Sequence, residues 1–282
     1  MEKVLRKVKQ YIPQTLFRRF QWPYHFLFAV FAALWYRFPS RRLMVIGVTG
    51  TKGKTTVVHL LHEILQSAGM KTASLSSVRF KIGDREEANL SKMTMPGRLF
   101  VQRFLRRAVR AGCAYVVLEV TSQGIAQSRH RFIRFDAAAM TNVALEHIES
   151  HGSFERYIRA KLDLFWRLRP GAVAVINRDD PAAGRFAAAT RAHRAWYDKN
   201  AIELDSKTWK VGHANAGLDG IAFDIDGKTF TSSLSGMFNM YNILGAIAVG
   251  LSQHIQLEKI ATAIAHFSGV PGRMEILHRR PF

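Results

Sequence analysis

The amino-acid sequence predicts an α/β fold with a mostly parallel sheet flanked by helices and a small antiparallel β subregion. Two observations predict it. From Leu43 onward, short apolar runs rich in β-branched residues alternate with longer segments of helical periodicity, and such alternation is typical of parallel strands covered by helices. After about Arg191 the apolar runs shorten, and Asp226-Gly227 within residues 221–232 is typical of a two-residue hairpin turn.

The elements of this fold can be placed along the chain. Gly69 follows the first predicted helix, as expected of a residue that ends one. Strands are predicted at 43–48, 71–76, 114–120, 137–141 and 172–177, with helices at 55–68, 97–111, 153–169, 179–189, 238–252 and 257–266.

The amino-acid composition excludes some classes of function and favours others. The chain has 282 residues, 48% hydrophobic and 22% charged, which is ordinary for a folded protein. The single cysteine, Cys113, excludes a disulfide framework or a cysteine-rich metal site, and it fits the cytoplasm. The net charge of +20 predicts anionic partners such as a nucleotide, a phospholipid or a sugar phosphate. Nucleic acid is not expected as a partner, because no recognisable reading motif accompanies the charge.

Residues 1–42 form a basic, aromatic segment with nine Lys or Arg and one acidic residue. Its apolar run, residues 22–36, is shorter than the roughly 20 residues of a spanning helix and is not followed by a cleavage site. One interpretation is a helix lying on an anionic membrane surface, at the inner face of the cell membrane. The other is a helix buried against the following domain or a partner.

The most specific motif in the sequence is a phosphate-binding loop. The stretch Gly47-Val-Thr-Gly50-Thr-Lys-Gly53-Lys54-Thr55-Thr56 lies between a predicted strand and a predicted helix. Glycines let backbone N–H groups point at phosphate oxygens, Lys54 would neutralise the β- and γ-phosphates, and the Thr55 hydroxyl can ligate Mg²⁺. The common pattern has a glycine where this chain has Val48, so the loop is a variant. The predicted nucleotide contacts are Gly50, Thr51, Lys52, Gly53, Lys54, Thr55 and Thr56.

The stretch TGTKGKTT is similar to the loop of Mur ligases, and further motifs of that family follow in order. The resemblance covers roughly 43–277 and is greatest to the central domain of UDP-N-acetylmuramoyl-tripeptide synthetases. The motifs are Thr94-Met-Pro96, Glu119-Val-Thr-Ser122, Thr141-Asn142, Glu146-His147, Tyr157–Phe165, Asn177–Pro181, Asn239–Asn242 and Pro271–Arg273.

The resemblance implies an ATP-dependent ligase of peptidoglycan precursor synthesis. Such an enzyme joins an amino acid to the carboxylate of a UDP-MurNAc-peptide through an acyl phosphate and forms ADP and phosphate. The implied cofactors are ATP and two Mg²⁺ ions, the partners are the nucleotide-sugar peptide and the amino acid, and the implied state is a cytoplasmic monomer.

The resemblance also assigns site residues. It implies Lys54, Lys161 and His147 as catalytic residues, with a first Mg²⁺ at Thr55 and Glu119 and a second at His147 and a carbamylated Lys161. Glu119 ends the apolar strand at the carboxyl edge, where open α/β sheets bind ligands, although a salt-bridged carboxylate is the alternative. Lys161 taken alone would be a solvated surface charge.

The remaining implied contacts concern the nucleotide and the substrate. Asn239 and Asn242 would reach the adenine, with helix capping as the alternative for Asn239. Arg273 would reach the ATP phosphates, or would be only a linker charge. Thr94 and Ser122 would contact the sugar-peptide substrate.

The predicted domain organisation is a helical segment over 1–42 and an ATP-binding domain over 43–282. Mur ligases continue into a C-terminal domain that carries the amino acid, so we expect that domain to be absent from this chain, which alone would be inactive. Two alternatives stay open: a non-catalytic membrane-surface nucleotide-binding module, and a folylpolyglutamate-type ligase, which usually has Gly-Lys-Gly-Ser in its loop.

A row of arginines is a further candidate surface. The spacing of Arg103, Arg106, Arg107 and Arg110 places them on one face of the predicted helix 97–111. A solvated face is the simplest interpretation, and binding of an anionic lipid or of the nucleotide-sugar is the alternative.

Overall fold

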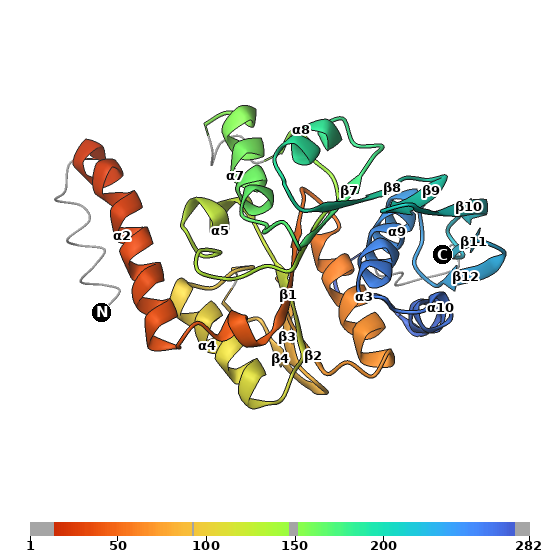
Figure 1. Cartoon of the computed structure of the whole chain (residues 1–282), viewed down its shortest axis with the longest axis horizontal. Helices are drawn as coiled ribbons and strands as arrows, with labels where there is room; N and C mark the ends of the chain where they lie inside the picture. The colour runs from red at the N-terminus through yellow and green to blue at the C-terminus, as the bar shows by residue number, and fades with distance from the viewer. Residues whose placement is uncertain (1–13, 92, 147–151, 274–282) are drawn as a thin grey trace, which may run out of the picture.

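A computed structural model describes residues 14–91, 93–146 and 152–273. Its central feature is one sheet, which has 12 strands in the described residues (Figure 1). The middle strands, in spatial order, are β2 (Thr72–Leu75), β5 (Tyr115–Glu119), β1 (Met44–Thr49), β6 (Ala137–Met140), β7 (Val173–Asn177) and β8 (His193–Tyr197), and all neighbours among them pair in parallel.

Antiparallel strands extend the sheet at both ends. One end carries β3 (Arg79–Ile82) and β4 (Arg85–Ala88). The other carries β9 (Ala201–Leu204), β10 (Lys207–Ala216), β11 (Ile221–Ile225) and β12 (Lys228–Ser232). The predicted turn at Asp226-Gly227 joins β11 to β12, and both of its residues have positive φ, 48° and 80°.

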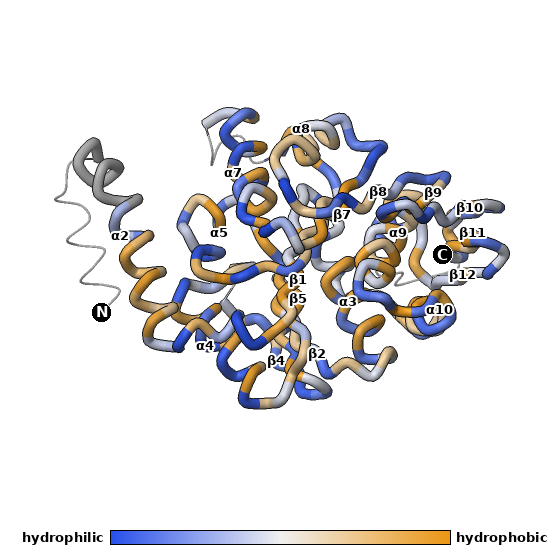
Figure 2. The backbone as a smooth tube through the Cα atoms, in the orientation of Figure 1, coloured by the Kyte–Doolittle hydropathy of each residue, from blue (hydrophilic) through white to orange (hydrophobic). Residues whose placement is uncertain are grey.

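Two helical layers cover the sheet, because each buried strand presents alternate side chains to opposite faces. Ile46 and Val48 of β1 pack into one core, and Val45 packs into the other. The first layer contains α3 (Lys54–Ser67), α9 (Met237–Ser252) and α10 (Leu257–His266). The second contains α4 (Arg98–Arg110), α5 (Ser122–Ala126), α7 (Phe154–Trp166) and α8 (Ala183–Ala188). Figure 2 shows hydrophobic segments concentrated in the central strands and in α9.

The predicted α/β fold is confirmed, and three details differ from the sequence prediction. Strand β8 lies after Arg191 yet still pairs in parallel with β7. The hairpin β3–β4 was not predicted, because Arg, Lys and Glu side chains interrupt any apolar alternation there. Helix α8 is shorter than the predicted helix 179–189, since it spans six residues.

Helix α2 (Gln14–Trp35) contains residues 22–35 of the apolar run and is followed by the short 3₁₀ helix η1 (Pro39–Arg42). It packs against α4, with Ala29, Ala32 and Ala33 buried. Small side chains at these positions allow the two helices to approach closely. Among the described residues, no helix is both long enough and apolar enough to cross a membrane.

We expect the fold to lose stability in mild acid, because helix α3 contains two buried histidines. Burial lowers the pKa of His59 and of His62 from 6.5 to about 4, with the nearby Lys81 charge adding to the effect. As the pH falls, these histidines therefore take up protons at a higher pH in the unfolded chain than in the folded one. The free energy of unfolding keeps its full value above pH 6.5 and decreases as the pH falls toward 4. At pH 5 the expected loss is about 2 kcal/mol for each histidine.

Urea unfolding at pH 7 and pH 5 tests this prediction. His59→Gln removes the titrating ring and keeps a polar group beside the Ser76 hydroxyl, which lies 3.0 Å from Nε2 of His59. We expect this variant to lose less stability than the wild type between the two pH values. The exposed His266→Gln is the matched control. An unchanged pH dependence in His59→Gln would contradict the assignment.

Candidate nucleotide-binding site

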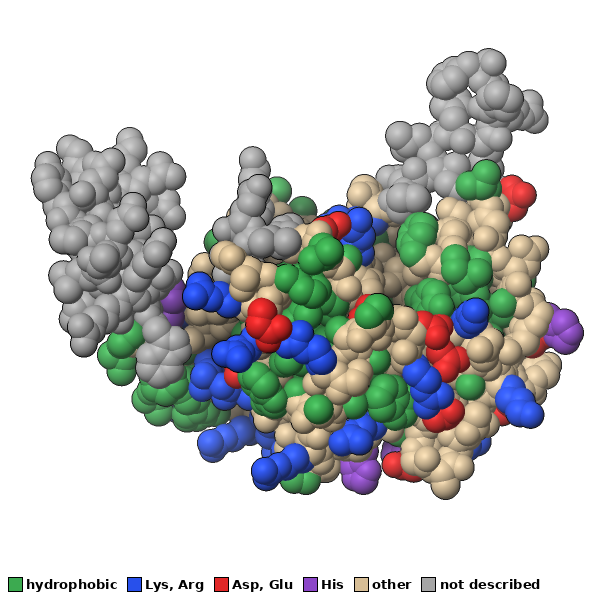
Figure 3. Space-filling model, turned by 90° about the horizontal axis from the view of Figure 1, so that it is seen from above, with side chains coloured by type: hydrophobic (Ala, Val, Ile, Leu, Met, Phe, Trp, Pro, Cys, Tyr) green, Lys and Arg blue, Asp and Glu red, His purple; other side chains and the backbone are tan. Residues whose placement is uncertain are grey.

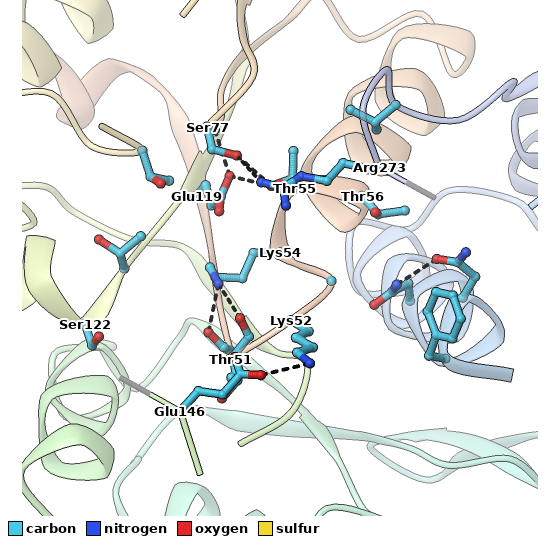
Figure 4. A pocket seen from close by; sticks show the side chains of 18 of the residues that line it. Thr51, Lys52, Lys54, Thr55, Thr56, Ser77, Glu119, Ser122, Glu146 and Arg273 are labelled. Carbon is cyan, nitrogen blue, oxygen red and sulfur yellow. Dashed lines mark hydrogen bonds and ion pairs between the residues drawn. The ribbon is translucent and has the colours of Figure 1, made fainter. Parts of the chain in front are cut away.

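A cavity of about 780 Å³ lies at the carboxyl end of the parallel strands (Figure 4). The predicted loop forms its floor, and the start of α9, the start of α5 and helix α7 contribute to its walls. Open α/β sheets bind ligands at this edge. The cavity is lined by every predicted nucleotide, metal and substrate residue that the structure describes: Gly50, Thr51, Lys52, Gly53, Lys54, Thr55, Thr56, Thr94, Glu119, Ser122, Lys161, Asn239, Asn242 and Arg273.

The loop between β1 and α3 needs both of its glycines. A Cβ atom on Gly50 would lie 1.8 Å from Oγ1 of Thr141, and one on Gly53 would lie 2.0 Å from Oδ1 of Asn242. Gly53 also has a φ of +81°, which glycine adopts without strain. Val48 is a buried residue of β1, which explains the variant pattern, because the loop begins only at Gly50.

The close approach of Gly53 to Asn242 predicts that Gly53→Ala weakens nucleotide binding. The added methyl group would push the loop away from α9 and strain the backbone at the start of α3. We expect at least a tenfold loss of affinity for a fluorescent ATP analogue in a titration. Gly184→Ala is the matched control, since a Cβ there meets no atom within 4 Å. Equal affinity of Gly53→Ala and the wild type would contradict this account of the loop.

Two lysines converge on the loop carbonyls. Nζ of Lys54 donates to the carbonyls of Gly50 (3.1 Å) and Thr51 (2.8 Å). Nζ of Lys161 donates to the Gly50 carbonyl at 2.6 Å and lies 4.5 Å from the centre of the Tyr157 ring. The Tyr157 hydroxyl in turn lies 2.8 Å from Oγ1 of Thr51. Helix α7 is thereby fixed against the loop.

Lys161 is buried, with 1% of its surface exposed, so the interpretation as a solvated surface charge is wrong. Burial, together with the Lys54 charge, holds the pKa of Lys161 well below its usual value. Burial also lowers the pKa of Lys54. An amine with a lowered pKa is more often neutral and therefore more nucleophilic near neutral pH.

Three oxygen-bearing side chains meet on the other side of the loop. Oε2 of Glu119 accepts hydrogen bonds from the Thr55 hydroxyl (3.0 Å) and from the backbone N–H of Ser77 (2.9 Å). The hydroxyls of Thr55 and Ser77 are 2.9 Å apart. One carboxylate and two hydroxyls are the hard oxygen donors that Mg²⁺ prefers. Within the described ranges there is no group of three or more His, Cys, Asp and Glu that could hold a metal.

Ser77 was not singled out from the sequence. It follows strand β2, whose neighbour β5 ends in Glu119, so both residues lie at the same sheet edge. That adjacency follows only from the strand order. Nη2 of Arg273 donates to Oγ of Ser77 at 3.1 Å, which places the predicted phosphate contact beside the oxygen cluster (Figure 4).

Asn239 and Asn242 lie in the first turns of α9 and are buried. Nδ2 of Asn242 donates to Oδ1 of Asn239 at 3.0 Å, and Nδ2 of Asn239 donates to the Ser235 carbonyl at 2.9 Å. Gly236 occupies the N-cap position, so helix capping does not account for Asn239. The pair forms a polar wall at the helix start.

The predicted substrate residues Thr94 and Ser122 line the same cavity. Figure 4 shows Ser122 on the opposite side of the loop from Thr56 and Arg273. Ser122 is the first residue of α5, which is capped by the Thr121 hydroxyl accepting from the N–H of Gly124 at 3.0 Å. Lys52 forms an ion pair of 2.8 Å with Glu146, which also lines the cavity. The predicted metal ligand His147 lies outside the described residues.

Comparisons with known proteins agree with this geometry. Residues 48–250 match the Mur ligase middle domain. The chain is 39% identical over 246 residues to a UDP-N-acetylmuramoyl-L-alanyl-D-glutamate–2,6-diaminopimelate ligase of Gloeobacter violaceus, covering 86% of this chain and 49% of the relative. It is 34% identical to a UDP-N-acetylmuramyl-tripeptide synthetase of Roseiflexus, covering 88% of this chain and 51% of the relative.

A solved structure of a UDP-N-acetylmuramoyl-L-alanyl-D-glutamate–2,6-diaminopimelate ligase superposes with a TM-score of 0.72 and 26% identity, covering 84% of this chain and 49% of that one. The chain thus spans about half the length of the curated relatives it matches. The match to the family domain runs through the phosphate loop, the oxygen cluster and the start of α9. The chain belongs to the Mur ligase family.

Proposed function

We propose that this chain is the ATP-binding centre of a ligase that joins an amino acid to the carboxylate of a UDP-MurNAc-peptide in peptidoglycan precursor synthesis. The supporting observation is the cavity itself, because the two lysines, the oxygen cluster and the substrate-side residues Thr94 and Ser122 line one space. The names of the relatives favour this branch, since both the diaminopimelate ligase and the tripeptide synthetase act in it.

ATP would be held by the loop and by both walls of the cavity. The N–H groups at the start of α3 carry partial positive charge and would face the phosphates. Lys54 would leave the carbonyls of Gly50 and Thr51 to neutralise the β- and γ-phosphates, and Arg273 would leave Ser77 for the same purpose. Asn239 and Asn242 would face the adenine. Further loop contacts are assigned to Gly50, Thr51, Lys52, Gly53, Thr55 and Thr56.

The proposed reaction has two displacements. A carboxylate oxygen of the peptide attacks the γ-phosphorus, the bond to the bridging oxygen breaks, and ADP leaves. The amino group then attacks the acyl carbon, phosphate leaves with the electron pair of the C–O bond, and the nitrogen loses a proton. Because an anion must approach a polyanion, cationic groups around the γ-phosphate carry most of the catalysis.

Mg²⁺ would supply the remaining neutralisation of charge. Thr55 and Glu119 are assigned to a first ion, and the oxygen donors that these residues bring together fit that role. Lys161 and His147 are assigned to a second. Lys161 would serve as a carbamate: its neutral amine attacks the carbon of CO₂, an N–C bond forms, and a proton leaves the nitrogen. Its burial and lowered pKa support this assignment.

We further propose that residues 1–42 form a segment of their own beside an ATP-binding domain over 43–282. The protein would act as a monomer in the cytoplasm, at the inner face of the membrane. Residues 1–42 would hold it on an anionic membrane surface.

Release of ADP tests the ligase proposal. The full-length protein is mixed with Mg²⁺, ATP, UDP-MurNAc-dipeptide and one amino acid at a time, including diaminopimelate and lysine. We expect ADP release that depends on the dipeptide substrate. Binding of ATP without such release under any combination would favour the non-catalytic nucleotide-binding module.

A further inference from the structure

An exposed apolar ridge runs along α2. It consists of Tyr24, Leu27, Phe31, Leu34 and Trp35, whose exposed fractions are 56%, 65%, 50%, 58% and 68%. Successive members are separated by one, three or four positions, which places them on one side of the helix. Scattered exposed apolar residues are normal, whereas a contiguous row of large ones marks an interaction surface.

The opposite side of α2 is held by the domain. Phe26 contacts Phe132 with ring centres 5.5 Å apart, and His25 contacts the guanidinium of Arg98 at the start of α4. Ala29 and Ala32 are buried. These contacts fix the orientation of the helix about its own axis. The ridge therefore points away from the domain. A partner of the ridge must approach from outside.

Aromatic rings form a continuous row on this outer side. The ring centres of Tyr24 and Phe28 are 5.7 Å apart, those of Phe28 and Phe31 are 6.2 Å apart, and those of Phe31 and Trp35 are 5.7 Å apart. Tyr and Trp stand at the two ends of the row. These amphipathic rings prefer the interface between lipid headgroups and acyl chains.

Positive charge adjoins the ridge. Between Trp35 and β1 the chain carries Arg37, Arg41 and Arg42 and no acidic residue. Helix α4, which packs against both α2 and η1, adds the exposed Arg103 and Arg110. Figure 3 shows hydrophobic side chains gathered at the left edge of the molecule, with Lys and Arg side chains beside them.

The charge decides which partner fits best. A second copy of this chain would bring the same arginines and the same net charge of +20 to the interface, and like charges oppose such an association. An anionic phospholipid surface is complementary to both features of α2. Its headgroup phosphates can bind the arginines, and the boundary of its acyl chains can take up the apolar ridge.

We propose that the ridge of α2, together with Arg37, Arg41 and Arg42, docks on an anionic phospholipid bilayer with the helix lying in the plane of the interface. The inference rests on the proposed attachment of residues 1–42 and assigns it to one face of one helix. It does not depend on ligase activity. Docking in this way would place α2 between the bilayer and the domain, with the domain-facing side unchanged.

Vesicle flotation of the full chain tests the proposal. We expect flotation with phosphatidylcholine vesicles that contain phosphatidylglycerol, and much less with phosphatidylcholine alone. The ridge variant Leu27→Ser/Phe31→Ser/Trp35→Ser is expected to lose flotation. Arg37→Gln/Arg41→Gln/Arg42→Gln should bind on the order of 100-fold more weakly, since each arginine near an anionic surface contributes about fivefold.

A matched control replaces three exposed apolar residues elsewhere, Leu90→Ser/Trp166→Ser/Leu218→Ser, and should float as the wild type does. Equal flotation of the ridge variant and the control would overturn the proposal. So would a wild-type dimer in light scattering that the ridge variant abolishes, combined with no vesicle binding, since a second copy would then be the partner.

A second measurement remains decisive if the triple variant does not fold. Lipids brominated near the headgroup should quench wild-type tryptophan fluorescence, and the single variant Trp35→Phe should remove most of that quenching. Quenching that persists unchanged in Trp35→Phe would overturn the docking geometry.

A titration with a fluorescent ATP analogue is run on the same samples. Flotation without nucleotide binding would contradict the proposed function alone, and nucleotide binding without flotation would contradict the membrane surface alone.

Discussion

Lys161→Ala is expected to abolish ligase turnover, with a fall in kcat of at least about 1000-fold. Lys161 is buried in the wall of the cavity with its amine 2.6 Å from the Gly50 carbonyl. As a carbamate it would carry a negative charge and would offset part of the positive charge of the second metal ion. The measurement is dipeptide-dependent ADP release.

Carbamylation has a readout that does not depend on activity. With ¹³C-labelled bicarbonate, the wild type should give a carbamate signal in the ¹³C NMR spectrum that Lys161→Ala lacks. Lys161→Glu should restore part of the turnover, because it supplies a carboxylate at the same position. Arg159→Ala, at an exposed position on the same helix, is the control and should retain activity. Undiminished turnover in Lys161→Ala would exclude the carbamate role.

Lys54→Met is expected to weaken ATP binding by about 100-fold or more, because it removes the charge-assisted hydrogen bonds to the phosphates. The lysine lies on the loop, bonded to the carbonyls of Gly50 and Thr51. Binding of a non-hydrolysable ATP analogue can be followed by calorimetry. Adenosine, which has no phosphates, should bind both proteins equally weakly.

Lys52→Met is the matched control for Lys54→Met. It removes a lysine of the same loop, but its side chain is 73% exposed and pairs with Glu146. We expect a loss of only a few fold. If Lys52→Met and Lys54→Met weakened ATP binding equally, the loop would act through general charge and the specific role of Lys54 would be wrong.

The parts of the site that are local in sequence could be predicted. The order strand, loop, helix around Gly50 and Lys54 follows from an apolar run, glycines and a helical pattern within some twenty-five residues. The position of Glu119 at the end of β5 follows from a similar run. The resemblance implies that Thr55 and Glu119 share a first Mg²⁺, and a hydrogen bond between these two side chains is observed.

The parts that depend on packing between distant elements could not be predicted. The amine of Lys161 contacts a carbonyl 111 positions away, and only the docking of α7 on the loop buries it. The fit of Asn242 against Gly53 depends on α9 crossing the loop, and the role of Ser77 depends on β2 lying beside β5. For α2, the hydrophobic run predicted a helix, but the contacts of Phe26 and His25 decide which side faces outward.

The proposed acyl-phosphate step can be measured without the incoming amino acid. ATP labelled with ¹⁸O in the bridge between the β- and γ-phosphates is incubated with the protein, Mg²⁺ and UDP-MurNAc-dipeptide. If the carboxylate reversibly takes the γ-phosphoryl group, the freed β-phosphate rotates and the label moves to a non-bridging position. We expect this exchange in the wild type, only with the dipeptide present, and none in Glu119→Gln. ATP that binds but keeps its label in the bridge under these conditions would contradict the proposal that this cavity performs ligase chemistry.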